Sequence, residues 1–168
     1  MVKKSSKFFI FLNKGQSYSL SHDISINKMK SQGYQVVYDF PYSHFTTFSE
    51  MNSIKSQCSS ETILCAGGVA SNNKDNLLLV SCGNCHSVLT QTPQNQPVLN
   101  NGAYWYMTDT FSFGFSPSNI IIQSNCDYYD NTDNKRLCWH LQGYSGGWRL
   151  GKLVSIYTSD YHKIILLS

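Results

Sequence analysis

Charged side chains are scarce in this 168-residue sequence, where Asp, Glu, Lys and Arg make up 14% of the residues, against about 25% in an ordinary soluble domain. The net charge is only +3, and the lysines are scattered along the chain. A protein that binds nucleic acid through its phosphates needs a concentrated basic patch. The charge pattern therefore excludes nucleic acid as the expected partner.

Long apolar runs are missing too. The longest are Phe8–Leu12, Leu77–Val80 and Ile164–Leu167, whereas a helix that crosses a bilayer needs about 18 apolar residues. We therefore expect no membrane span.

The opening stretch MVKKSSKFFIFLNKGQ has the basic start of a signal peptide, but its apolar run is five residues long. That is shorter than the usual run of about 7 to 15, and no small-residue cleavage site follows. We interpret residues 1–17 as an N-terminal strand or extension. The expected location is the cytoplasm or a virion-like assembly, with an extracellular location as the alternative.

Glutamate is nearly absent, since Glu50 and Glu61 are the only two. Three of the aspartates lie in the polar stretch CDYYDNTDNK, which is typical of a loop rather than of a catalytic cleft with two carboxylates. A cysteine nucleophile with a histidine base lacks a supporting family signature. The sequence therefore predicts a protein that is not an enzyme.

Short apolar runs separated by Gly, Asn, Ser and Pro fill most of the chain, which is the pattern of an all-β protein. We predict one domain over residues 1–168, a two-sheet β-sandwich or jelly-roll-like fold with one short helix. The expected strands are Lys7–Leu12, Tyr34–Phe40, Thr62–Ala66, Leu77–Cys82, Ser87–Thr92, Ala103–Thr108, Phe111–Phe115, Asn119–Gln123, Arg136–Leu141, Trp148–Ile156 and Lys163–Leu167.

Two local signals are specific. Thr47 followed by Glu50 predicts a capping box at the start of a helix, with Met51 and Ile54 on its apolar side. Asn101-Gly102 predicts the tight turn of a hairpin, because both residues accept positive φ angles.

The stretch SCGNCHSVLTQT places Cys82, Cys85 and His86 in the C-x-x-C-H spacing of covalent haem attachment. The surrounding runs resemble strands, and no export signal precedes them, so the structural context disagrees with a haem protein. Zinc would need a second pair of ligands at suitable spacing. We prefer to interpret CGNC as a turn between two strands and expect no cofactor, keeping metal or haem binding as an alternative.

The six cysteines could also form disulfides, and their pairing stays open among 15 connectivities. Pairing of neighbours along the chain would give Cys58–Cys65, Cys82–Cys85 and Cys126–Cys138. Free buried thiols are equally acceptable in a reducing compartment.

The loop aspartates Asp127, Asp130 and Asp133 offer oxygen ligands of the kind that calcium prefers. Their spacing differs from that of an EF-hand, and a solvated acidic turn is the more common explanation.

The densest stretch of aromatic and glycine residues is RLCWHLQGYSGGWRLGKL. In strand alternation Leu137, Trp139 and Leu141 share one face, and Cys138 and His140 share the other. The glycines that follow permit tight turns. The alternative is a buried tryptophan with a structural arginine.

We predict an aromatic, Gly-rich rim that stacks on a sugar or docks on a protein. Its expected members are Trp105, Tyr106, Tyr144, Trp148 and Arg149.

Three stretches, NGAYWYMTDTFSFGFSPSNIIIQSN, DNKRLCWHLQGYSGGWRLG and YHKIIL, resemble an uncharacterised small β-rich domain of predicted protist, simple-animal and large-DNA-virus proteins. Its pattern includes R-L-S-W-H-L and G-G-W/Y-R-x-G, and the likeness covers most of the chain. The resemblance implies no established activity. Cys138 stands where the pattern has Ser, and Cys126 where it has a small residue, which makes a bridge between them plausible. The pattern also lacks a histidine after its C-G-N-C, which argues further against haem.

Together these observations predict a non-enzymatic interaction or structural module. Its partner would be a glycan or a protein contacted through the aromatic rim. A structural subunit of a larger assembly, such as a virion or a surface layer, is the alternative, and a homo-oligomer would fit it.

Overall fold

The computed structural model describes residues 17–126, 133–141 and 146–168. Its strands form two antiparallel sheets, which confirms the predicted all-β, two-sheet class. The predicted strand Lys7–Leu12 lies outside the described residues. The first sheet has the order β1-β4-β3-β11-β2. Its strands are β1 (Ile24–Ser25), β2 (Gln35–Pro41), β3 (Ile63–Ala70), β4 (Asn73–Asn84) and β11 (Tyr161–Leu167).

The second sheet has the order β10-β9-β8-β7-β6-β5, so each of its strands lies beside its neighbour in sequence. Its strands are β5 (Val98–Asn100), β6 (Ala103–Met107), β7 (Ser112–Ser116), β8 (Leu137–His140), β9 (Arg149–Leu150) and β10 (Leu153–Val154). The first sheet differs, because β11 lies between β2 and β3, far from either in sequence.

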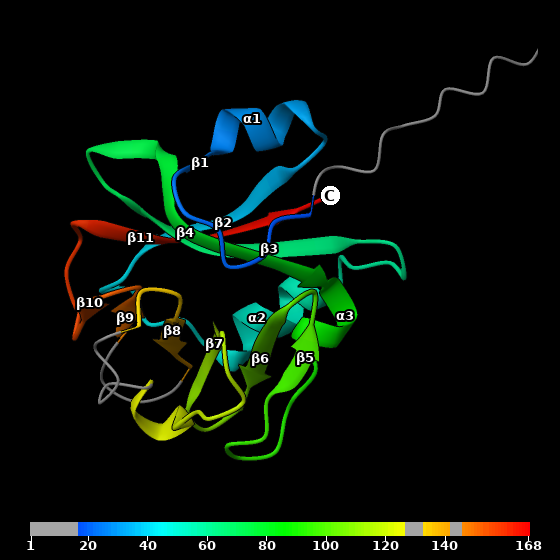
Figure 1. Ribbon diagram of the computed structural model, residues 1–168, viewed down its shortest axis with the longest axis vertical. Coiled ribbons are helices and arrows are strands. Elements are labelled where there is room, and N and C mark those ends of the chain that lie inside the picture. The colour runs from blue at the N-terminus through cyan, green and yellow to red at the C-terminus, as the bar shows by residue number, and fades with distance from the viewer. Residues whose placement is uncertain (1–16, 127–132, 142–145) are drawn as a thin grey trace, which may run out of the picture.

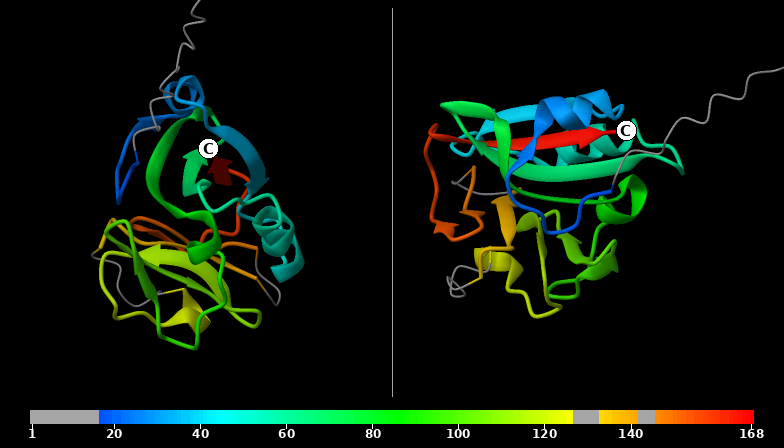
Figure 2. Two further views of the ribbon diagram at one scale, coloured as in Figure 1. Left: turned by 90° about the vertical axis from the view of Figure 1, so that its right-hand side faces the viewer. Right: turned by 45° about the horizontal axis from the view of Figure 1, so that its top comes forward.

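The two sheets pack face to face around a shared core (Figures 1 and 2). Leu64 and Leu79 project into this core from the first sheet, and Trp105, Phe113 and Trp139 project from the second. The Phe113 and Trp139 rings lie 5.0 Å apart between centroids, a favourable distance for an aromatic pair. The period of two in these strands therefore directs the large aromatic residues inward.

The opposite face of the first sheet carries a second apolar cluster under helix α1 (Ile26–Ser31), seen at the top of Figure 1. Ser25 caps this helix by accepting a hydrogen bond from the Lys28 amide. Ile26 and Met29, three residues apart, are both buried against the sheet. The sequence analysis did not predict this helix, because six residues are too few to display a helical period.

Helix α2 (Phe48–Lys55) confirms the predicted capping box. The Thr47 hydroxyl accepts from the Glu50 amide, and the Glu50 carboxylate accepts from the Thr47 amide. Met51 and Ile54 are buried in the shared core. The helix lies beside the junction of the two sheets (Figure 2, left).

The predicted hairpin is also confirmed. Asn101 and Gly102 both have positive φ angles, 48° and 76°, and they join β5 to β6. The Asn101 amide group donates to the carbonyl of Cys82, 3.0 Å away, so the hairpin tip is attached to the first sheet.

Three predicted strands are wrong or incomplete. Residues 87–92 do not form a strand, because Asn84 caps a short helix α3 (Cys85–Val88) by accepting from the Ser87 amide. Residues 119–123 pair with no neighbouring strand and lead into a 3-10 turn, η1 (Gln123–Asn125). The stretch 148–156 divides into β9 and β10, with a turn at Gly151, where φ is 59°.

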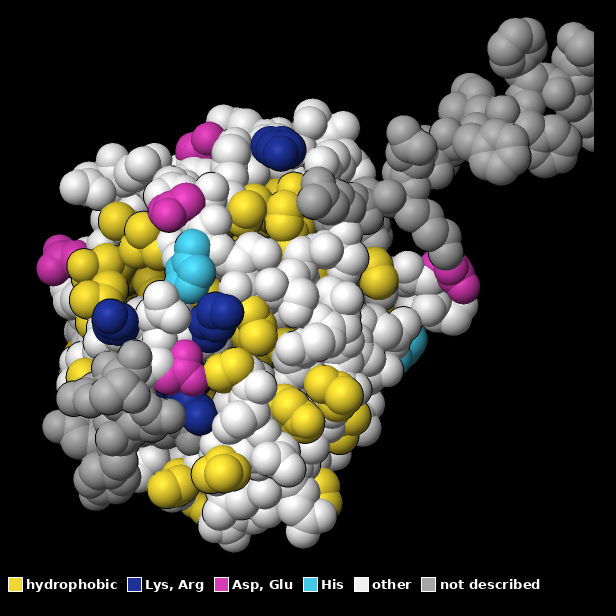
Figure 3. Space-filling view, in the orientation of Figure 1, with side chains coloured by type: hydrophobic (Ala, Val, Ile, Leu, Met, Phe, Trp, Pro, Cys, Tyr) yellow, Lys and Arg dark blue, Asp and Glu magenta, His cyan; other side chains and the backbone are white. Residues whose placement is uncertain are grey.

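The described residues therefore contain α1, α2 and α3 rather than one helix. Among them, none is long and apolar enough to cross a membrane. On the face shown in Figure 3, hydrophobic side chains form separate patches within a surface that is mostly polar and uncharged, as the composition predicts.

Candidate functional site

Two members of the predicted rim lie in the interior. Trp105 is 1% exposed and faces the core between the sheets, where its indole donates to the Asn100 carbonyl. Tyr106 is also 1% exposed and packs over Gly114 against the Cys126–Cys138 disulfide. Neither ring is available to an external ligand, so their assignment to a binding rim is wrong.

Arg149 is a structural residue rather than a surface one. Its side chain is fully buried, and it donates to the carbonyls of Gly151 and Asp133 at 3.0 and 2.7 Å. A guanidinium group presents several donors in a fixed plane, so this one side chain ties the β9–β10 turn to the segment before β8. The Arg149 side chain therefore stabilises the second sheet.

Trp148 is the described member of the rim that reaches the surface, where it is half-buried. Its ring meets His140 and Tyr157 edge to face, with centroids 5.2 and 5.0 Å apart. Tyr157 is 45% exposed. Burial lowers the pKa of His140, although its hydrogen bond to the Phe111 carbonyl opposes the shift, so His140 is neutral at pH 7. Tyr144 lies outside the described residues.

A second aromatic group, missed in the sequence analysis, lies where β2 ends. The rings of Phe40 and His44 stack with centroids 4.3 Å apart, and the next residue, Phe45, is 52% exposed. The imidazole of His44 contacts the Glu50 carboxylate at 2.9 Å. The available signal was the stretch DFPYSHF, in which aromatic residues directly follow a strand and a proline.

Glu50 holds this second group in place. Burial opposes ionisation of its carboxyl group, but hydrogen bonds from His44 and Thr47 outweigh that effect and lower its pKa. The carboxylate is therefore charged at pH 7. It joins the start of α2 to the ring that stacks on Phe40.

Lys163 ties the two aromatic groups to β11. Its side chain is fully buried, and the Nζ atom lies 2.7 Å from each of three oxygens, the His44 carbonyl, the Thr46 hydroxyl and the Gly146 carbonyl. Lysine is rarely buried without such partners. The segment that carries His44 and the segment that leads to Trp148 are therefore attached to the same ammonium group.

Glycine allows these two segments to approach each other. A Cβ atom at Gly146 would overlap the carbonyl of His44, and one at Gly147 would overlap the ring and carbonyl of Tyr42. The Tyr42 hydroxyl donates to the Arg149 carbonyl at 3.0 Å. The predicted role of these glycines in tight backbone packing thus has a specific partner, the segment after β2.

We call the resulting surface the aromatic edge. It consists of the exposed or half-buried rings of Phe40, His44, Phe45, Trp148 and Tyr157. The segments that carry these rings are joined by Lys163, by the packing of Gly146 and Gly147, and by a hydrogen bond from the Ser43 amide to the Thr158 carbonyl at 3.2 Å.

Gly147→Ala tests this packing. We expect it to lower the free energy of unfolding by about 1 to 3 kcal/mol, the usual cost of overpacking, because Tyr42 is fully buried and cannot move aside. Urea unfolding followed by tryptophan fluorescence measures the change. The exposed Ser159→Ala is the control, and equal stability of the two variants would contradict the close approach seen here.

The C-x-x-C-H stretch is not a turn between two strands, because Cys82 belongs to β4 and Cys85 begins α3. Their sulfurs form disulfides with Cys65 and Cys58, respectively. Thiols in disulfides cannot form thioether bonds to haem or ligate a metal as thiolates, and the His86 side chain is exposed on α3. The arrangement does not fit a haem or metal anchor.

Of the three loop aspartates, Asp127 and Asp130 lie outside the described residues. Asp133 accepts hydrogen bonds from the Lys135 amide and the Arg136 guanidinium. The described part of the chain contains no cluster of three or more side chains suited to hold a metal ion.

The structure selects one of the 15 connectivities that the sequence left open, and of the three neighbour pairings considered above it contains only Cys126–Cys138. The bridges are Cys58–Cys85, Cys65–Cys82 and Cys126–Cys138. Strand register explains the difference, since Cys65 and Cys82 lie directly opposite each other on β3 and β4. Disulfides form and persist in oxidising compartments, so the expected cytoplasmic location is not supported.

Comparisons with protein-family models, curated proteins and solved structures found no match for this chain. The resemblance to an uncharacterised β-rich domain therefore stays a hypothesis. Any function must be argued from the aromatic edge and the rest of the described surface.

Proposed function

We propose that this protein is a non-enzymatic binding module and that its aromatic edge takes a glycan. The observation that carries the proposal is the exposure of three aromatic rings on segments joined by the buried Lys163 and by the hydrogen bond from Ser43 to Thr158. Phe40, Phe45 and Tyr157 are 39%, 52% and 45% exposed. An exposed ring on a rigid segment offers a flat apolar face at little cost in conformational entropy.

The groups around these rings favour a glycan over an apolar protein surface. His44 and Glu50 each have a side chain that is one-third exposed, so their polar atoms can reach a ligand that lies on Phe40. A sugar ring has an apolar face for stacking and hydroxyl groups for such hydrogen bonds. A partner with a wholly apolar surface would remove water from the exposed part of this His44–Glu50 pair without offering it a new hydrogen bond, which is unfavourable.

A binding role without catalysis fits the state of the nearby reactive groups. The Glu50 carboxylate is occupied by His44 and by the capping box of α2. Every cysteine of the described residues is in a disulfide. A secreted or surface-exposed module of this kind would also be compatible with three disulfides.

Phe45→Ala on a glycan array tests the proposal. For a glycan that the wild-type protein retains, we expect about fivefold weaker binding, because a stacked ring contributes about 1 kcal/mol. Isothermal titration with the best glycan measures the change. Stability should hardly change, since the ring is half exposed.

Leu99→Ala is the matched control, because it truncates an apolar side chain that is 58% exposed on the second sheet. It should leave the affinity unchanged. The proposal fails if the array retains no glycan or if both variants weaken binding equally. If a protein partner binds instead, and Phe45→Ala weakens that binding, the ligand of the aromatic edge is a protein rather than a glycan.

A further inference from the structure

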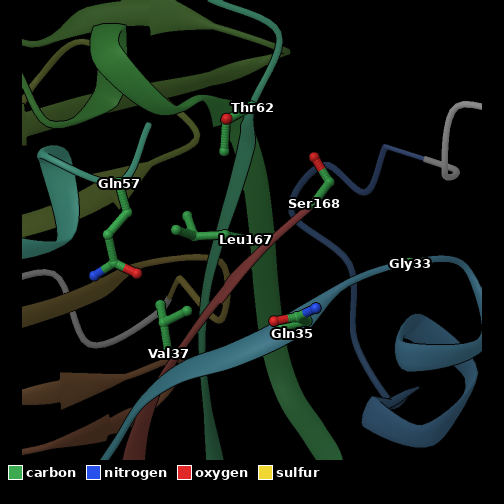
Figure 4. Close-up of a pocket in the computed structure, with 7 residues that line it drawn as sticks. All are labelled: Gly33, Gln35, Val37, Gln57, Thr62, Leu167 and Ser168. Carbon is green, nitrogen blue, oxygen red and sulfur yellow. The ribbon is translucent and has the colours of Figure 1, made fainter. Parts of the chain in front are cut away.

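A pocket of about 200 Å³ opens where β2 and β11 meet the segment between α2 and β3. Figure 4 shows its lining, with the amides of Gln35 and Gln57 on either side of the apolar side chains of Val37 and Leu167. Thr62, Ser168 and Gly33 complete the lining. None of these residues belongs to the aromatic edge.

The Gln57 side chain of this pocket is held in place. The Gln57 amide nitrogen donates to the Ser53 carbonyl at 3.3 Å, and the amide oxygen is turned toward Val37 and Leu167 in Figure 4. The next residue, Cys58, is bonded to Cys85. These contacts fix the Gln57 side of the pocket before any ligand arrives, which lowers the entropy cost of binding.

The two hydroxyl groups are positioned in the same way. Thr62 accepts from the Ser59 amide at 2.8 Å. Ser168 accepts from the Ile63 amide at 3.0 Å, which leaves its hydroxyl hydrogen available to donate. The pocket therefore presents the polar groups of Gln57, Thr62 and Ser168 at fixed places beside an apolar floor.

The chemistry of the lining selects the ligand. Of the described residues that line the pocket, none has a charged side chain, so an ionised ligand would be desolvated without an opposite charge. A purely apolar ligand would cover the amide groups without giving them hydrogen-bond partners, which costs about 1 to 3 kcal/mol for each group. The volume is below the roughly 300 Å³ of a drug-sized site, so the ligand must be small.

We infer that this pocket binds a single neutral sugar ring, with its hydroxyls on Gln35 and Gln57 and its apolar face on Val37 and Leu167. Amide groups both donate and accept, as hydroxyl groups do, so the two sets are complementary. The inference does not depend on the aromatic edge, because the two sites share no residue.

Titration of the oxidised, ¹⁵N-labelled protein with methyl glycosides of glucose, galactose, mannose and N-acetylglucosamine tests the inference. We expect at least one of them to shift the side-chain amide signals of Gln35 and Gln57 in a saturable way. Gln57→Ala should weaken that sugar about tenfold, the effect of one lost hydrogen bond. Gln96→Ala, in an exposed turn, is the matched control and should bind as the wild type does.

Glucuronate provides the charge test, and it should bind at least tenfold more weakly than its neutral counterpart. The inference is overturned if no sugar shifts the two glutamine signals, if Gln57→Ala binds as tightly as the control, or if glucuronate binds best. Phe45→Ala separates the two sites. This variant should show the same sugar-induced shifts of Gln35 and Gln57 as the wild-type protein. If it loses glycan binding on the array but keeps these shifts, the loss is due to the aromatic edge.

Discussion

Reduction of the three disulfides is expected to unfold the domain at room temperature. The bridges join residues 27, 17 and 12 positions apart, and a loop of about 15 residues is worth about 3 kcal/mol. Cys65–Cys82 lies within the loop closed by Cys58–Cys85, so these two contribute less than twice that amount. The stabilisation from all three bridges together is still comparable to the free energy of unfolding of an ordinary domain, which is roughly 5 to 15 kcal/mol.

Near-ultraviolet circular dichroism in a reducing buffer measures this effect, with thiol counting to show that all bridges are open. The double variant Cys126→Ala/Cys138→Ala is the control, because it removes one bridge outside the shared core. It should lose about 3 kcal/mol and stay folded. A fully reduced protein that keeps its native spectrum would show that the hydrophobic core is sufficient without the bridges.

Lys163→Met is expected to lower the free energy of unfolding by about 2 to 4 kcal/mol. The variant removes the donor from the carbonyls of His44 and Gly146, whereas the Thr46 hydroxyl keeps its hydrogen bond to Tyr38. Each buried acceptor that loses its donor costs about 1 to 3 kcal/mol. Removal of a buried ammonium group also removes its desolvation cost, so the net loss is smaller than the sum. Urea unfolding measures it, with the exposed Lys152→Met as the control.

The pH dependence of stability gives a second measure of Lys163. Burial lowers the pKa of this lysine to about 7, although the charge of Glu50 opposes the shift. Between pH 7 and the usual lysine value of 10.5, the unfolded chain holds a proton that the folded protein releases. The contribution of Lys163 to stability therefore rises with pH, by at most about 1.4 kcal/mol per pH unit, and is lost as the pH falls through 7.

Urea unfolding at pH 7, 8 and 9 measures this effect. The free energy of unfolding should gain less with pH in Lys163→Met than in the wild-type protein. Burial raises the pKa values of Tyr38 and Tyr42, so neither tyrosine titrates in that range. The same change of unfolding free energy with pH in both proteins would mean that Lys163 keeps its proton in the folded state up to pH 9.

Local patterns predicted the parts of this fold that depend on near neighbours. The alternation of Leu137, Trp139 and Leu141 with Cys138 correctly separated the core face of β8 from its outer face. The capping box depended on residues three apart. By contrast, the place of β11 between β2 and β3 depends on contacts across most of the chain, which no local pattern displays.

The candidate site was only partly predictable for a related reason. The sequence shows that Trp105 lies among aromatic residues and Arg149 near glycines, but it does not show which way they face. Arginine is seldom fully buried unless it is paired, and two partners of Arg149 are backbone carbonyls, which every sequence has. Phe45 was missed because a single exposed ring after a strand looks like any surface phenylalanine.

The position of β11 also constrains how this protein can be made. Because ribosomes deliver the chain from its amino end, β2 and β3 emerge well before the strand that must lie between them. Their edges stay open to association with other chains until β11 arrives, and such non-local pairing is slow. Production of this domain should therefore benefit from chaperones that shield open strand edges while synthesis is completed.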